Sequence, residues 1–264
     1  MTNPIYLDNQ ATTPLDPAVL ESMLPYYTDK FGNAASIHHS FGHEAKDAVE
    51  KSRKIITKEL NTSAREIVFT SGATESINLA IKGVCEKNKD KGSHIITQVT
   101  EHNAVLDTCS ALERRGWEIT KLPVQQDGRI DPKLIEDAIR KDTVLVIIMH
   151  ANNEIGVIQP VREIGDICKH HDIYFLVDAC QSFAKISIDV QKINVDLLAF
   201  TAHKIYGPKG IGALFIKKKN PPVELELQMD GGGHERGFRS GTLPVALIVG
   251  FGKAVELCSR DRDS

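Results

Sequence analysis

Polar residues follow several apolar runs of this chain, and their types could do chemistry at one site. Ser71–Glu75 (SGATE) follows the run EIVFT, and its small residues allow a tight turn before a helix expected to start near Thr74. The free backbone N–H groups at such a helix start can bind a phosphate. The alternative is a capping box, in which Thr74 or Ser71 caps the helix and nothing is bound.

Asp178 and Lys204 each follow another apolar run. A carboxylate at the end of a buried strand is costly unless it is paired. A protonated heteroaromatic nitrogen is one good partner for Asp178, and capping of the next helix is the alternative. A lysine beside such polar groups is partly desolvated, which lowers its pKa and makes it nucleophilic toward an aldehyde. For Lys204 the alternative is an ordinary surface lysine on a loop.

These three features together predict one particular cofactor. Thr74 belongs to a phosphate cradle, Asp178 is a carboxylate for a ring nitrogen, and Lys204 is an amine for a Schiff base. Those are the groups that a protein supplies to pyridoxal phosphate. The joint pattern is far more specific than any one of its parts.

The elements that must position these residues alternate between short apolar runs and helical periodicity. Helices are expected at 44–60, 75–86, 103–115, 131–140 and 161–171, and strands at 66–70, 94–97, 144–150, 174–178, 197–201 and 211–216. Apolar strands separated by helices indicate an α/β fold, with a mostly parallel sheet and helices on both faces. In such sheets ligands bind at the carboxyl ends of the strands.

The bulk composition is that of a globular protein. Apolar residues make up 41% of the chain and charged residues 25%, and the net charge is −3. The chain therefore lacks the excess of basic residues that would indicate nucleic-acid binding. The longest apolar runs are too short to span a bilayer, and the start MTNPIYLDNQ lacks the pattern of a secretory signal. The five cysteines, without a CxxC pair, indicate a reduced chain. We therefore expect a cytoplasmic protein that binds neither membrane nor nucleic acid.

Longer stretches make the similarity to a known family explicit. They are YLDNQATTP, EIVFTSGATESINLAIKG, EHNAVLDTC, MHANNEIGVIQP, VDACQS, TAHKIYGPKGIGALF and GGGHERGFRSGTLP. These stretches resemble those of cysteine desulfurases, fold-type-I pyridoxal-phosphate enzymes in the class V branch of the aminotransferase-like family. The resemblance runs from about Tyr6 to about Leu257. HKIYGPKG together with RSGT resembles the housekeeping and nitrogen-fixation branch.

The resemblance implies roles for individual residues. Lys204 would form the Schiff base, Asp178 would pair with the ring nitrogen, and His102 would stack on the ring and help to move protons. Gln181 would hydrogen-bond the phenolic oxygen, and Asn153 would lie beside that oxygen and the substrate. The implied phosphate ligands are Ala73 through its backbone, Thr74, Thr201, His203 and, reaching the phosphate of a second subunit, Thr242. The last of these implies a homodimer.

The implied activity is conversion of L-cysteine to L-alanine. The sulfur would be passed on as a persulfide to an iron–sulfur scaffold or to a sulfur carrier for tRNA thiolation. We expect an N-terminal arm at 1–15 and a cofactor-binding large domain at 16–257. The small domain of the family, with its persulfide cysteine and substrate-binding arginine, is expected to be absent. Its absence predicts an exposed apolar face formed by Leu247, Ile248, Phe251, Ala254 and Val255.

Other interpretations stay open. The chain could be another class V enzyme such as a selenocysteine lyase, or a truncated, degenerate or split chain that binds the cofactor without turnover. Cys180 stands where the family often has Thr or Ala, and its place at a strand end argues against delivery of sulfur. His39 and His43 have the spacing of one helical face, with His38 beside them, but no second ligand pair is evident, so we expect no metal.

Overall fold

The computed structural model describes residues 4–218 and 222–262, in which seven strands form one sheet. The strands are β1 (Ile67–Thr70), β2 (His94–Gln98), β3 (Glu118–Leu122), β4 (Thr143–Met149), β5 (Tyr174–Asp178), β6 (Leu197–Thr201) and β7 (Gly212–Ile216). Their order across the sheet is β1-β7-β6-β5-β4-β2-β3. β7 pairs antiparallel with β1 and β6, and all other neighbouring strands are parallel. The expected mostly parallel sheet is confirmed.

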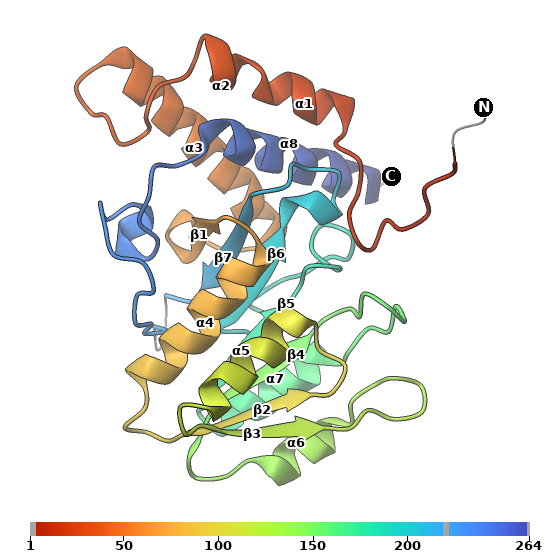
Figure 1. The fold of residues 1–264 in the computed structure, drawn as a ribbon. Helices are drawn as coiled ribbons and strands as arrows, with labels where there is room; N and C mark the ends of the chain where they lie inside the picture. Colours follow the sequence, from red (N-terminus) through yellow and green to blue (C-terminus); the bar gives the residue numbers. More distant parts are fainter. Residues whose placement is uncertain (1–3, 219–221, 263–264) are drawn as a thin grey trace.

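Helices cover both faces of this sheet (Figure 1). They are α1 (Pro17–Met23), α2 (Pro25–Thr28), α3 (Ser40–Leu60), α4 (Ala73–Lys87), α5 (Asn103–Glu113), α6 (Pro132–Ala138), α7 (Val161–His170) and α8 (Val245–Arg262). Three short 3₁₀ turns are η1 (Ala64–Glu66), η2 (Ala202–Lys204) and η3 (Glu235–Gly237). Residues of α4 and α5 share one apolar core with the sheet, and residues of α3, α7 and α8 share the other.

Two-sided burial explains why the strands consist of unbroken apolar runs. Successive side chains of a strand point to opposite faces of a sheet. In β4, Val146 and Ile148 join the core under α3, α7 and α8, whereas Leu145 and Ile147 join the core under α4 and α5. All seven residues of β4 are buried. Both faces therefore need apolar side chains, because alternation of apolar and polar residues would place polar side chains in one of the two cores.

Side-chain caps set the starts of α6, where the sequence predicted one, and of α3, which begins at Ser40 and so before the expected residue 44. Asp131 caps α6 by accepting a hydrogen bond from the Lys133 amide (2.9 Å), with Pro132 in the first turn, as predicted. His39 caps α3, because its Nδ1 accepts from the Gly42 amide at 3.2 Å. His43 Nε2 lies 2.9 Å from the Ile37 carbonyl.

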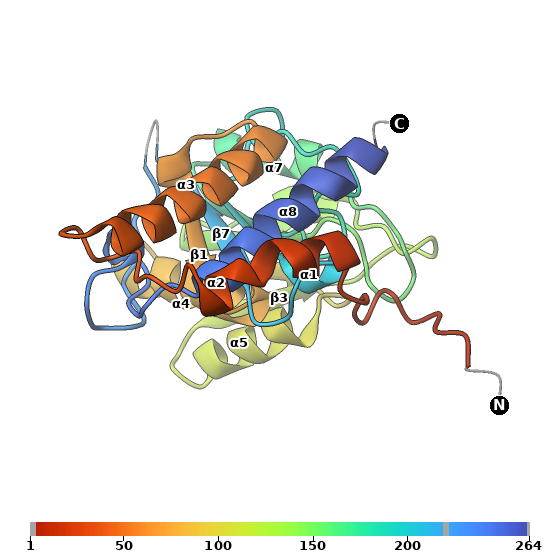
Figure 2. The ribbon, with the colours of Figure 1, turned by 90° about the horizontal axis from the view of Figure 1, so that it is seen from above.

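The predicted exposed apolar face of the last helix is wrong. Ile248 and Phe251 are fully buried, and Ala254 and Val255 nearly so. The reason is that α1 and α3 pack against α8 on either side (Figure 2). Close approach is helped by Gly252, because a Cβ there would lie only 2.8 Å from the Ser52 Cβ.

Several elements were not anticipated from the sequence pattern. These are α1, α2, β3 and the helical form of α8. β3 lies at the edge of the sheet, and of its residues only Leu122 is buried. An edge strand needs fewer apolar side chains and so lacks the expected run. Within the described ranges, no helix combines the length and the apolar character that a membrane span requires.

Candidate active site

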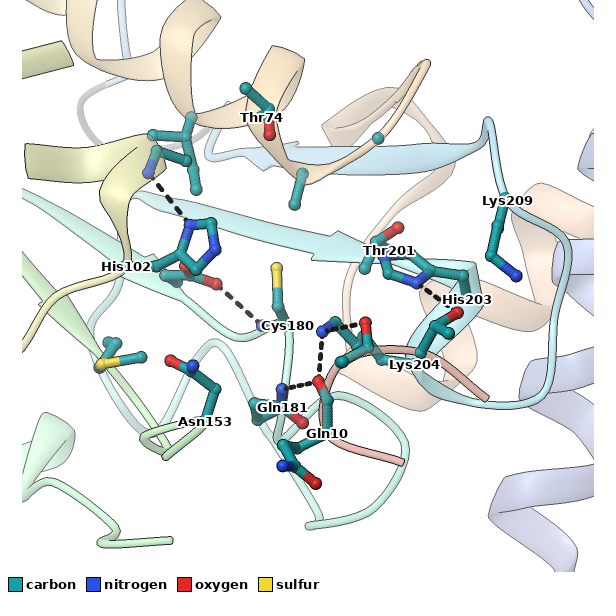
Figure 3. A pocket seen from close by; sticks show the side chains of 18 of the residues that line it. Gln10, Thr74, His102, Asn153, Cys180, Gln181, Thr201, His203, Lys204 and Lys209 are labelled. Atoms are coloured by element: carbon teal, nitrogen blue, oxygen red, sulfur yellow. Dashed lines mark hydrogen bonds between the residues drawn. The ribbon is translucent and has the colours of Figure 1, made fainter. Parts of the chain in front are cut away.

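A pocket of about 870 Å³ opens at the carboxyl ends of the parallel strands (Figure 3). Nine of the ten site residues expected from the sequence line it: Ala73, Thr74, His102, Asn153, Asp178, Gln181, Thr201, His203 and Lys204. The tenth, Thr242, is exposed and does not line this pocket. The long apolar strands thus bring together residues that are far apart in the chain.

The turn before α4 leaves a helix start open toward the pocket. Gly72 is the N-cap residue and offers no side-chain hydrogen bond, so the capping-box alternative is wrong. A Cβ placed on Gly72 would meet nothing within 4 Å, so the space in front of the helix is open. The first-turn amides of α4, beginning at Ala73, therefore have no side-chain cap and fit an anionic group.

Lys204 lies in the pocket and not on a surface loop. Its Nζ donates hydrogen bonds to the backbone carbonyls of Gln10 and Ala11, the latter at 2.7 Å. Burial lowers the pKa of Lys204, although the nearby Cys180 and Asp178 act in the opposite direction. A lowered pKa favours the uncharged, nucleophilic amine.

The N-terminal segment is attached to the turn that carries this lysine. Thr13 donates to the His203 carbonyl through both its amide (3.0 Å) and its hydroxyl (2.9 Å), and the hydroxyl accepts from the Tyr206 amide at 2.8 Å. The Gln181 side-chain amide also donates to the Gln10 carbonyl (2.7 Å). The arm therefore forms one wall of the pocket and holds three of the expected site residues, Gln181, His203 and Lys204.

Sequence reasoning missed this part of the lining. Residues without an assigned role that line the pocket include Asp8, Gln10, Ala11, Thr12, Glu154 and Lys209. The stretch YLDNQATTP was recognised as part of the resemblance, but no residue in it received a role. Its placement beside Lys204 comes from contacts between residues more than 190 positions apart.

Asp178 ends β5 with its side chain in the pocket, and it is only 4% exposed. Its Oδ1 accepts a hydrogen bond from the Cys180 amide at 2.9 Å, so it forms a local turn and does not cap a helix.

The Cys180 sulfur points into the space between His102 and His203 (Figure 3). Burial and the charge of Asp178 raise the pKa of Cys180 well above its ordinary value. This thiol is therefore a poor nucleophile.

Two histidines face the pocket with defined ring positions. His102 Nδ1 accepts from the Ala104 amide at 3.0 Å, so a neutral His102 carries its proton on Nε2. His203 Nδ1 lies 3.1 Å from the Thr12 hydroxyl. Burial, with the charges of Lys204 and Lys209, lowers the pKa of His203 to about 4. His203 is therefore a neutral hydrogen-bonding group at physiological pH.

None of the other cysteines is an activated thiolate. All five cysteines are free. Burial raises the pKa of Cys85, Cys109, Cys168 and Cys258, that of Cys109 to about 12. Reactive cysteines need the opposite shift.

Thr242 follows a loop that is tied to the pocket by an ion pair. Arg239 Nε lies 2.8 Å from Glu75 Oε1, and Glu75 Oε2 accepts from the Ser71 amide at 2.7 Å. Both side chains of the pair are about four-fifths buried. The loop is thus anchored at the start of α4, while Thr242 itself is exposed and does not line the pocket.

Taken together, these residues could hold pyridoxal phosphate. An uncapped helix start can receive the phosphate, a buried carboxylate can receive a protonated ring nitrogen, and a partly buried amine lines the same pocket. No group of three or more His, Cys, Asp or Glu residues placed to hold a metal ion occurs in residues 4–218 or 222–262.

Comparison with known proteins agrees with this geometry. The family described as Aminotransferase class-V matches residues 5–262. The chain is 56% identical over 264 residues to "Cysteine desulfurase IscS" of Anaeromyxobacter dehalogenans, covering 100% of this chain and 65% of that protein. It is 56% identical over 258 residues to the protein of the same name from Neisseria meningitidis serogroup C / serotype 2a, covering 98% and 64%. The chain thus spans slightly less than two thirds of these curated relatives.

Solved structures share the fold over nearly the whole chain. "SspA in complex with cysteine" superposes with a TM-score of 0.92 at 45% identity, covering 96% of this chain and 72% of that one. "NIFS-LIKE PROTEIN" superposes with a TM-score of 0.94 at 42% identity, covering 98% and 70%. The chain therefore belongs to the aminotransferase class-V family and is similar throughout its length to cysteine desulfurases.

Proposed function

We propose that this chain carries the pyridoxal-phosphate site of a cysteine desulfurase, which takes sulfur from L-cysteine and leaves L-alanine. The observation that carries the proposal is the convergence of Lys204, Asp178 and the open start of α4 in one pocket. The name of the relatives and the structure titled as a complex with cysteine support the substrate.

The pocket offers a separate set of residues to each part of the cofactor. The amides at the start of α4 and the side chains of Thr74, Thr201 and His203 would hold the phosphate. Since burial keeps His203 neutral, it contributes a hydrogen bond and no charge. Asp178 would pair with the protonated ring nitrogen, and Gln181 and Asn153 would hydrogen-bond the phenolic oxygen and the substrate. When bound, pyridoxal phosphate supplies an electron-accepting ring that stabilises negative charge on a substrate carbon.

Two side chains that line the pocket, Lys204 and His102, are proposed to transfer protons. Lys204 Nζ has a lowered pKa and can accept a proton once it leaves the carbonyls of Gln10 and Ala11. His102 offers Nε2, because Nδ1 is occupied by the Ala104 amide. General acid–base catalysis needs such groups within reach of the reacting atom.

The remaining parts of the proposal concern assembly and location. Thr242, exposed and outside this pocket, is proposed to reach the phosphate of a second copy, which would make the protein a homodimer. An iron–sulfur scaffold or a sulfur carrier for tRNA thiolation is the proposed sulfur acceptor. We place the protein in the cytoplasm, where its thiols stay reduced.

The test of the cofactor site is the visible absorption that a lysine–pyridoxal-phosphate Schiff base gives. The chain mixed with pyridoxal phosphate should develop this band, and Lys204→Ala should abolish it. Lys209→Ala is the matched control, because Lys209 also lines the pocket but is exposed. A band that persists in Lys204→Ala, or disappears in Lys209→Ala alone, would show that the lysine is wrongly assigned.

A further inference from the structure

A buried polar cluster lies just behind the pocket, at the carboxyl ends of β2 and β4. Its members are Gln98, Thr100, Glu101 and His150, and each has a fully buried side-chain atom without a hydrogen-bond partner. In residues 4–218 and 222–262, all such atoms belong to this cluster. Unsatisfied buried polar atoms are costly and rare. All four lie within four positions of His102 or Met149 in the chain, and both of these residues line the pocket. This placement links the cluster to the pocket.

Glu101 is the centre of the cluster. Its Oε1 accepts hydrogen bonds from the Met149 amide (2.6 Å) and from the Gln98 side-chain amide (2.9 Å), whereas Oε2 has no partner. Met149 is the last residue of β4 and pairs in register with Asp178 of β5. The residue after Glu101 is His102. One carboxyl group thus ties the loop that presents His102 to the strand next to Asp178.

Asn152 makes a second connection between the same two loops. Its Nδ2 donates to the Thr100 carbonyl at 2.9 Å, and its Oδ1 accepts from the Glu154 amide at 2.8 Å. These bonds hold the loop after β4, which presents Asn153, against the loop after β2, which presents His102. Neither Glu101 nor Asn152 lines the pocket itself.

The surroundings of Glu101 disfavour a negative charge. The residue is 5% exposed, and burial raises its pKa to about 8, with a further contribution from the charge of Asp178. Cys109 of α5 faces it as a neutral thiol, because its own pKa is raised to about 12. His150, at the end of β4, has a pKa lowered by burial and is also uncharged. The causes that shift the pKa of Glu101 include no charge of a basic side chain.

We propose that Glu101 is a positioning residue of the cofactor site, which links the loops of His102 and Asp178 as a neutral carboxylic acid. This inference rests on the proposed function. When Glu101 loses its proton at higher pH, a second negative charge arises beside Asp178. That charge favours the protonated forms of the cofactor ring and of its bond to Lys204. The visible band of the protonated form should therefore persist to higher pH than it would beside a neutral side chain.

The decisive variant is Glu101→Gln, which has nearly the same shape and is neutral at every pH. Below the pH at which Glu101 ionises, the visible absorption of the variant should match that of the parent. Above that pH the two absorption–pH curves should separate, and the variant should lose the band at a lower pH than the parent. Glu66→Gln is the control, since Glu66 is also buried but lies before β1, at the end of that strand away from the pocket. It should leave the titration of the band unchanged.

A measurement without the cofactor separates this inference from the proposed function. Glu101 binds its proton more tightly in the folded chain than at its ordinary pKa of 4.5. Stability from this group is thus lost as the pH rises from about 4.5 toward about 8. The melting temperature of the parent relative to Glu101→Gln should fall across this interval and level off above it. For Glu66 burial acts to raise the pKa, but hydrogen bonds from Thr62, Lys218 and Ser63 lower it overall. The difference between the parent and Glu66→Gln should therefore stay constant across this interval.

The parent chain itself provides a readout if Glu101→Gln does not fold. The chain has four methionines, so selective ¹⁵N labelling gives few signals, and Met149→Leu identifies that of Met149. Its amide should titrate with a midpoint well above the ordinary glutamate pKa. A midpoint at the ordinary value, or identical pH profiles of the parent and Glu101→Gln, would overturn the inference. A missing visible band in the parent would instead count against the cofactor site.

Discussion

Burial determines the protonation of the single residues that face the pocket. It lowers the pKa of Lys204, lowers that of His203 to about 4, and raises that of Cys180. All three shifts favour the uncharged form, as expected where water is partly excluded. An uncharged amine is reactive toward an aldehyde, whereas an uncharged thiol is not. The same physical cause therefore activates Lys204 and suppresses Cys180.

Asp178 allows a test at the scale of one atom. Asp178→Asn keeps the Oδ1 that accepts from the Cys180 amide but removes the negative charge. Hydrogen bonds to charged groups contribute about 1.5–3 kcal/mol. Affinity for pyridoxal phosphate should accordingly fall by about tenfold or more, measured by absorbance titration. Asp189→Asn, a change at a carboxylate that bonds Asn61 outside the pocket, is the control. Equal affinity of Asp178→Asn and the parent would refute the pairing with the ring nitrogen.

At the scale of elements, the site depends on segments that meet without being neighbours in sequence. The N-terminal arm reaches the 3₁₀ turn η2 through Thr13, and the loop before α8 reaches the start of α4 through the Arg239–Glu75 pair. The strands supply the positions of Asp178 and Thr201, and the attached segments close the pocket around them. The arm is thus part of the site wall.

Thr13→Val tests whether the arm is held in this way. The variant keeps the shape of a side chain that is 3% exposed but removes the hydroxyl that bonds His203 and Tyr206. The Tyr206 amide then loses its acceptor, whereas the His203 carbonyl keeps the bond from the Thr13 amide. The lost hydrogen bonds contribute about 0.5–1.5 kcal/mol each. We expect a lower melting temperature and faster proteolytic cleavage of the arm. Thr57→Val is the control, because the Thr57 hydroxyl bonds only within α3. If the arm is cleaved at the same rate in both variants, its attachment through Thr13 is not important.

On the scale of the whole molecule, cofactor binding and sulfur transfer are separable. The pocket is lined by nine of the residues proposed to hold the cofactor, whereas each of the five cysteines has a raised pKa. Desulfuration needs a thiolate that attacks the sulfur of the substrate. We propose that this thiolate does not come from any of these five residues. The chain spans 65% of the length of the first relative described above.

The expected outcome is that the 264-residue chain binds pyridoxal phosphate and responds to L-cysteine by a change of its spectrum. It should not release sulfide or alanine over many turnovers. Alanine released from selenocysteine but not from cysteine would favour a selenocysteine lyase. Multiple turnover with L-cysteine that survives Cys180→Ala would contradict the assignment of the sulfur chemistry.

The sequence by itself determined six of the seven strands of the sheet and the sides of the pocket that follow them. Apolar runs such as 144–149, and polar residues directly after them such as Asp178 and Lys204, are local patterns. Their meaning follows from the geometry of parallel sheets. The open start of α4 likewise follows from a short stretch of small residues.

Only the tertiary structure decided which surfaces and groups meet across long distances. It covered Ile248 and Phe251 with α1 and α3, where the sequence predicted an exposed face. It also brought the Gln10 carbonyl to accept a hydrogen bond from Lys204 Nζ, and it left Glu101 Oε2 without a hydrogen-bond partner. The periodicity of a sequence shows that one face of a helix is apolar. The position of a residue after an apolar run shows that a carboxyl group lies near a strand end. The segment that packs there is decided by the total packing of the chain, since burial and hydrogen bonding depend on all neighbours at once.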